Sequence, residues 1–96
     1  MSGGYFDYDQ YKIGEVADQI RKLVERNERQ TFNKEEKYSA ETIARFIDAE
    51  KTLRLGEIMA QRIDWLESGD DSEKTFHERW FDDMRGFWSN YKEPSK

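Results

Sequence analysis

His77 is the only histidine of the chain and the first candidate for chemistry. Glu73 lies one helical turn before it, so a carboxylate–imidazole pair could act as a general base or bind a metal ion. The spacing is i, i+4, whereas di-iron bundles use Glu-x-x-His at i, i+3 and use it twice. One histidine without any cysteine is also a weak metal-binding set. We therefore expect a structural role for His77, no metal ion and no cofactor.

The acidic run at positions 70–73, Asp-Asp-Ser-Glu, could hold a divalent cation through its side-chain oxygens. A calcium-binding loop would need alternating acids and a distant bidentate glutamate, and the sequence has neither. Helix capping explains the run more simply. Gly69 suits the left-handed conformation that ends a helix, and Asp70 and Glu73 resemble a capping box with aspartate in the place of serine or threonine. We expect residues 68–72, named the elbow below, to join two helices.

Other catalytic patterns are missing from the sequence. It has no phosphate-binding glycine loop, no zinc-ligand spacing and no Ser-His-Asp set that can be placed on helices. Asp82, Asp83 and Asp64 could form a carboxylate pair, but acids on a solvated helix face are common. We therefore expect a protein that is not an enzyme.

Three helices are expected to position these residues, over about 9–27, 39–68 and 72–91. Ser39 is a natural N-cap for the second helix, and Pro94 lies beyond the third. Residues 28–38 lack periodicity and are predicted to form a loop pinned by Phe32 and Tyr38, and residues 1–8 form an aromatic arm. The sequence thus predicts one all-α domain over 1–96, with a C-terminal antiparallel helical hairpin.

Large apolar residues recur along the third helix at spacings that place them on one face. We expect this stripe to be the core of the helical domain, with a docking groove or a dimer seam as the alternative. Trp65 and Phe81 fall off the main stripes and are therefore better candidates for an interface. The stripe comprises Phe76, Trp80, Met84, Phe87, Trp88 and Tyr91.

The composition limits the class of protein. The chain has 96 residues, of which 35% are hydrophobic, 39% charged and 15% aromatic, so we expect a thin core enriched in rings. It has no cysteine, no secretory signal pattern and no apolar stretch near the roughly 20 residues that span a bilayer. A net charge of −5 disfavours direct nucleic-acid binding. We expect a cytoplasmic protein without a membrane segment.

The negative charge is concentrated around the elbow. Between positions 64 and 83, eight acidic residues are opposed only by Lys74 and Arg79. Such a row of carboxylates on a rigid hairpin can imitate nucleic-acid phosphates or dock into an arginine-rich groove. A merely solvated helix face is the simpler interpretation.

Two segments resemble a group of short, uncharacterised bacterial and phage proteins. They are Ser2-Gly3-Gly4-Tyr5-Phe6-Asp7-Tyr8 and the run from Asp64 to Phe76, which contains Trp-Leu-x-Ser-Gly-Asp-Asp. The resemblance covers the two ends of the chain, and it implies a small stand-alone cytoplasmic protein, phage-borne and located in the host cytoplasm. Small acidic phage proteins are often inhibitors of host machinery, including defence systems. No catalytic residue follows from the resemblance.

These patterns lead to one main hypothesis. We expect an acidic, non-enzymatic protein that binds and inhibits a protein partner with a basic or nucleic-acid-binding surface. A homo-oligomeric assembly protein, such as a homodimer, is the alternative. The acids would supply orientation and association rate, and the aromatic residues would supply buried contact. The candidate partner-binding residues are Tyr5, Phe6, Asp64, Trp65, Glu67, Asp70, Asp71, Glu73 and Phe81.

Overall fold

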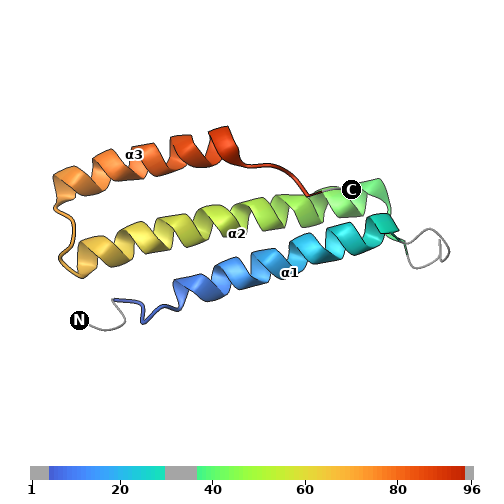
Figure 1. Cartoon of the computed structure of the whole chain (residues 1–96), viewed down its shortest axis with the longest axis horizontal. Helices are drawn as coiled ribbons and strands as arrows, with labels where there is room; N and C mark the ends of the chain where they lie inside the picture. Colours follow the sequence, from blue (N-terminus) through green and yellow to red (C-terminus); the bar gives the residue numbers. More distant parts are fainter. Residues whose placement is uncertain (1–4, 30–36, 95–96) are drawn as a thin grey trace.

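The fold consists of three α-helices joined in an antiparallel sequence. The computed structural model describes residues 5–29 and 37–94, and within these ranges it contains no strand. The helices are α1 (Gln10–Arg29), α2 (Ala40–Glu67) and α3 (Glu73–Asn90). The all-α, three-helix prediction is confirmed, and α2 and α3 form the expected hairpin (Figure 1).

The long helix α2 lies in the middle, with α1 along one side and α3 along the other (Figure 1). The two outer helices pack on α2 rather than on each other. The domain measures 54 × 27 × 15 Å along its principal axes. Its smallest dimension is little more than one helix with its side chains, about 10–12 Å. The fold is therefore flat, and few positions are far from solvent.

The apolar core is correspondingly small and lies between α1 and α2. Its buried members are Ala17, Val24, Ile43 and Ile47, and Phe46 packs against the last three. A second group of buried side chains is polar or charged, which a thin domain tolerates only where partners satisfy them. That group comprises Gln10, Asn27, Glu50, Arg62, Asp64 and Asp71.

The aromatic stripe of α3 forms a core only in part. No residue of α3 is fully buried. Most of the stripe is half-buried, but Trp88 is 59% exposed. The physical reason is that α3 has a single neighbouring helix, so no second helix covers its other sides.

Tyr38 connects the end of α1 to the start of α2. Tyr38 donates its backbone N–H to Oδ1 of Asn27 at 2.8 Å, and its ring packs on Phe46. Helix α1 continues to Arg29, slightly beyond its expected end. Phe32, the other residue expected to pin this loop, lies outside the described residues, as do positions 30–36.

The elbow has the predicted glycine but a different cap. Gly69 has φ of +86°, the left-handed conformation expected for a helix end. The capping box uses Ser72 and Thr75, whose side chains and backbone N–H groups bond reciprocally. The predicted box of Asp70 and Glu73 is therefore wrong by two residues, because α3 begins only after Ser72.

Candidate protein-interaction site at the elbow

The aromatic arm docks beside the elbow through one buried carboxylate. The backbone N–H groups of Tyr5 and Phe6 both donate to Oδ1 of Asp64, the second at 3.1 Å. Asp64 is only 6% exposed and lies one turn before the end of α2. Backbone donors stabilise a carboxylate that has lost its water. The sequence segments 5–8 and 64–72 thereby become neighbours.

A tight turn then connects the arm to α1. Asp7 and Tyr8 have φ of 53° and 66°, the left-handed region that non-glycine residues occupy at a cost. The turn is closed by a hydrogen bond of 3.0 Å from the backbone N–H of Asp9 to the carbonyl of Phe6. It leaves Tyr8 stacked on Tyr11, with ring centroids 6.1 Å apart. Two tyrosine rings thus stand at the start of α1.

A buried arginine organises the other side of the elbow. Arg62 donates to both carboxylate oxygens of Asp83, at 2.9 and 3.1 Å, and also to Asp71 at 3.4 Å. Asp71 accepts a further bond from Arg79. The guanidinium of Arg62 lies 4.6 Å from the ring centroid of Trp65, within the range of a cation–π contact. This network fixes α2 against α3.

The predicted partner-binding residues divide into internal and exposed groups. Asp64 and Asp71 are buried and have the internal partners just described. The remaining acids of the set are exposed, as are the rings of Tyr5, Trp65 and Phe81 at 61%, 37% and 66%, whereas Phe6 is half-buried. Phe81 contacts Arg85 on α3 and is not part of the arm–elbow contact. The exposed acids are Glu67, Asp70 and Glu73.

Trp65 joins the arm to the elbow in one concave surface, named the elbow hollow here. The hollow has a volume of about 230 Å³. A neighbouring depression of about 250 Å³ shares Tyr11, Gln61 and Trp65 with it. Tyr8 and Tyr11 were not among the predicted site residues, because their stacking depends on the left-handed turn at Asp7 and Tyr8 rather than on helical spacing. The elbow hollow is lined by Tyr8, Gln10, Tyr11, Gln61, Asp64, Trp65, Ser68 and Asp70.

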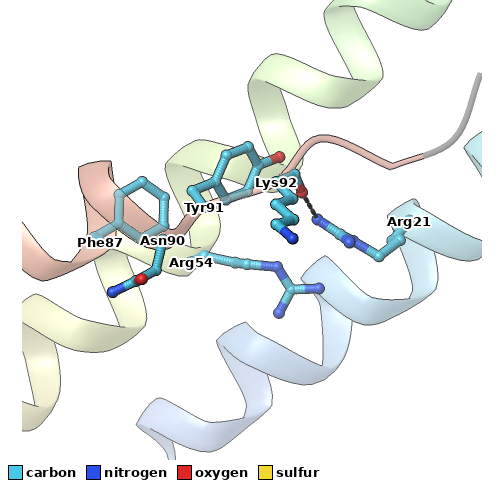
Figure 2. A pocket seen from close by; sticks show the side chains of 6 residues that line it. All are labelled: Arg21, Arg54, Phe87, Asn90, Tyr91 and Lys92. Atoms are coloured by element: carbon cyan, nitrogen blue, oxygen red, sulfur yellow. Dashed lines mark hydrogen bonds between the residues drawn. The ribbon is translucent and has the colours of Figure 1, made fainter.

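A second depression, the cationic hollow, lies near the middle of α2 and has the opposite charge. Its volume is about 420 Å³, and Figure 2 shows three cationic side chains converging there beside two aromatic rings. Arg21 donates to the backbone carbonyl of Lys92 at 2.6 Å, which ties the C-terminal residues 91–94 to α1 (Figure 2). The lining residues are Arg21, Arg54, Phe87, Asn90, Tyr91 and Lys92.

Two of the three cationic side chains of this hollow, Arg21 and Arg54, are already engaged by a buried acid. Glu50 is 0% exposed and accepts hydrogen bonds from Arg21, Arg54 and the Tyr91 hydroxyl. Burial alone would raise the pKa of Glu50, but these three hydrogen bonds outweigh it and hold the pKa below its usual value. Arg54 also pairs with Asp18 at 2.9 Å. The cluster therefore acts as an internal polar core.

His77 is exposed, and its ring packs edge to face with Phe76, with the ring centroids 5.2 Å apart. The described part of the chain contains no group of three or more histidine, aspartate or glutamate side chains placed to hold a metal ion. Its helices also include none that is long and apolar enough to cross a membrane.

Comparison with protein-family models, curated proteins and solved structures gives no match for this chain.

Proposed function

We propose that this chain is a small acidic protein that binds a basic surface of another protein and catalyses no reaction. The observation that supports the proposal is the arm–elbow contact, which gathers tyrosine and tryptophan rings and the exposed carboxylate of Asp70 around one hollow. Aromatic anchors bordered by charge are typical of energetically dominant interface residues. Carboxylates around such anchors favour fast, oriented association with a basic partner.

The resemblance to short bacterial and phage proteins makes the proposal more specific. A partner that binds nucleic acid carries a basic surface, and an acidic protein seated on it would block that surface. We therefore propose that the protein inhibits host machinery, such as a host defence protein, and acts in the host cytoplasm. Exposed acids, rather than Asp64 and Asp71, would contact the partner, because the latter are buried and paired inside the fold.

The test compares two triple charge reversals with the same net charge. The elbow variant Glu67→Lys, Asp70→Lys, Glu73→Lys changes exposed acids at the proposed face. The control Glu15→Lys, Glu28→Lys, Asp48→Lys changes exposed acids elsewhere. Each tagged protein is used to capture partners from a bacterial lysate at low and moderate salt, and the Kd of the captured partner is then measured.

We expect the elbow variant to lose affinity by roughly tenfold or more, while the control stays within about threefold of the wild type. Affinity of the wild type should also fall as salt rises, because exposed charges are screened. Equal affinities for the two variants would reject the acidic face as the binding surface. A lysate that yields no stoichiometric partner of the wild type would count against the proposed function as a whole.

A homo-oligomeric assembly protein is the second candidate, and one observation favours it. Phe81 and Trp88 are 66% and 59% exposed and seven residues apart, so they share one outer face of α3. Sedimentation velocity at micromolar concentration separates the two functions. A stable dimer that Phe81→Ser, Trp88→Ser converts to monomers would support assembly, whereas a monomeric wild type would reject an obligate dimer.

A further inference from the structure

Two buried oxygen atoms point to an unassigned ligand at the elbow hollow. Among the residues that the structure describes, the buried side-chain atoms without a hydrogen-bond partner are Oε1 of Gln10 and Oγ of Ser68. Both residues line the elbow hollow. Gln10 is only 2% exposed, and its amide nitrogen is already used by Gln61 at 2.7 Å. Buried polar groups are nearly always satisfied, so two exceptions in one hollow call for a polar ligand. The amide oxygen of Gln10 requires a donor, whereas the Ser68 hydroxyl can donate or accept.

The other lining groups define the charge of that ligand. Two carboxylates, from Asp64 and Asp70, line the hollow, and no lysine or arginine does. The remaining surface includes aromatic rings, whose faces attract cations. A ligand that is positively charged, rich in N–H groups and partly flat fits all of these features. The guanidinium of an arginine side chain has this chemistry.

The protein already uses the same recognition once within its own fold. The guanidinium of Arg62 stacks near Trp65 while its N–H groups donate to carboxylates. The volume of about 230 Å³ also suits a single side chain better than a free cofactor. Small-molecule sites usually measure about 300–1,000 Å³.

We propose that the elbow hollow binds one arginine side chain of the protein partner. This inference rests on the proposed function for the presence of a basic partner, and it names the residue that the partner inserts. The guanidinium lies beside the rings of Tyr11 and Trp65 and donates to Asp70 and to the orphan oxygen of Gln10. Glu67 and Glu73 contribute only longer-range attraction.

The test uses small probes, so that it does not depend on knowing the partner. N-acetyl-arginine amide is titrated into the full-length protein and followed by NMR at the Trp65 indole and the Gln10 and Gln61 side-chain amides. N-acetyl-citrulline amide has nearly the same shape without the charge, and N-acetyl-lysine amide has the charge without the planar group. We expect saturable shifts with the arginine probe, weaker binding of the lysine probe and none of the citrulline probe.

Two variants locate the site. Asp70→Asn removes an exposed charge from the hollow and should weaken the arginine probe by roughly two- to fivefold. Glu73→Gln removes an exposed charge outside the hollow and should weaken binding less, by under about twofold. Both positions are exposed, so neither change disturbs the buried network, and unchanged backbone spectra verify this.

The outcomes separate this inference from the proposed function. If an intact partner binds through the elbow acids but the arginine probe leaves the hollow resonances unmoved, the hollow is not an arginine site. Equal binding of the lysine and arginine probes, or equal effects of the two variants, also overturns it. If the arginine probe binds the hollow as described and no partner is captured, the hollow is an arginine site but the proposed function, and with it the partner as source of the arginine, fails.

Discussion

The buried carboxylate of Glu50 shows how this chain stabilises polar groups that it removes from water. Three donors from three parts of the chain, namely α1, α2 and the residues after α3, converge on it. A pKa below the usual value means that the fold favours the charged carboxylate. This contribution to the free energy of unfolding is present above the ordinary pKa of glutamate, and it is lost as pH falls through the lowered one.

Tyr91 offers a direct test of the cluster. Burial and the bond to Glu50 raise the pKa of Tyr91 to about 12. Because the folded protein favours the neutral phenol, its contribution is complete below pH 10.0 and is lost as pH rises toward 12. Tyr91→Phe should lower the free energy of unfolding at neutral pH by about 1–2 kcal/mol. Urea unfolding at pH 7 and between pH 10 and 12 measures both effects.

The control for Tyr91 is Tyr38→Phe, which removes a hydroxyl from a residue that is 50% exposed. It should change the free energy of unfolding by no more than about 0.5 kcal/mol. If the alkaline loss of stability is as large in Tyr91→Phe as in the wild type, Tyr91 is not its source.

The contribution of Glu57 to stability is expected to depend on pH in the opposite direction to that of Glu50. Burial raises the pKa of Glu57, Arg54 opposes this, and Asp18 adds to it. The fold therefore favours the neutral carboxyl, and stability falls as pH rises from the ordinary pKa through the raised one. Glu57→Gln should increase the free energy of unfolding at pH 7, with the gain disappearing below about pH 4.5. Glu15→Gln, at an exposed position of α1, should show no such gain in urea unfolding at either pH.

The candidate residues were only partly predictable at this scale. The exposed acids and Trp65 are local features that the sequence indicates directly. The internal role of Asp64 depends on distant donors, such as Tyr5, which lies 59 positions away. That of Asp71 depends on Arg62 and Arg79, which lie on the two helices beside the elbow. No local pattern reveals that a carboxylate accepts bonds from a backbone segment so far along the chain.

At the scale of elements, the helices and their turn follow from local rules. Apolar residues at helical spacing and capping residues determine where each helix begins and ends, which is why all three were predictable. The capping box was misplaced because residues 70 and 71 still belong to the turn after α2, where their backbone N–H groups donate to the carbonyl of Trp65, and α3 begins only after Ser72. Several oxygen-bearing residues in a row can cap a helix, and here the backbone bonds of the preceding turn decide which of them does.

Gly69 provides a test of the elbow. Gly69→Ala should lower the free energy of unfolding by about 1 kcal/mol, because its φ of +86° is unfavourable for a residue with a Cβ atom. Gly86→Ala is the matched control, since Gly86 lies inside α3 with open space around the new methyl group. It should stabilise the protein by up to about 1 kcal/mol. Thermal unfolding of both variants tests this prediction. If both substitutions change the free energy of unfolding in the same direction, Gly69 does not have the proposed role in ending α2.

At the scale of the whole molecule, the antiparallel hairpin of α2 and α3 was predictable but the flat arrangement was not. A short connection places these two helices side by side. Whether α1 also meets α3 depends on side-chain fit along α2, where buried Glu50 and Arg62 take positions that apolar residues would otherwise fill. The aromatic stripe is consequently half-exposed, and Tyr5 and Phe6 of the arm contact α2 through Asp64.

The tie between Arg21 and the carbonyl of Lys92 joins residues 71 positions apart and has a consequence for the order of folding. The two helical pairs consist mainly of contacts between consecutive helices and should form quickly. The tie can close only after both pairs exist, so it should be absent from the folding transition state. Stopped-flow measurements on Tyr91→Phe, which loosens the same segment, should then show unfolding accelerated by about 5–30-fold and an unchanged folding rate. Residues 91–94 would thus set how long the folded state persists.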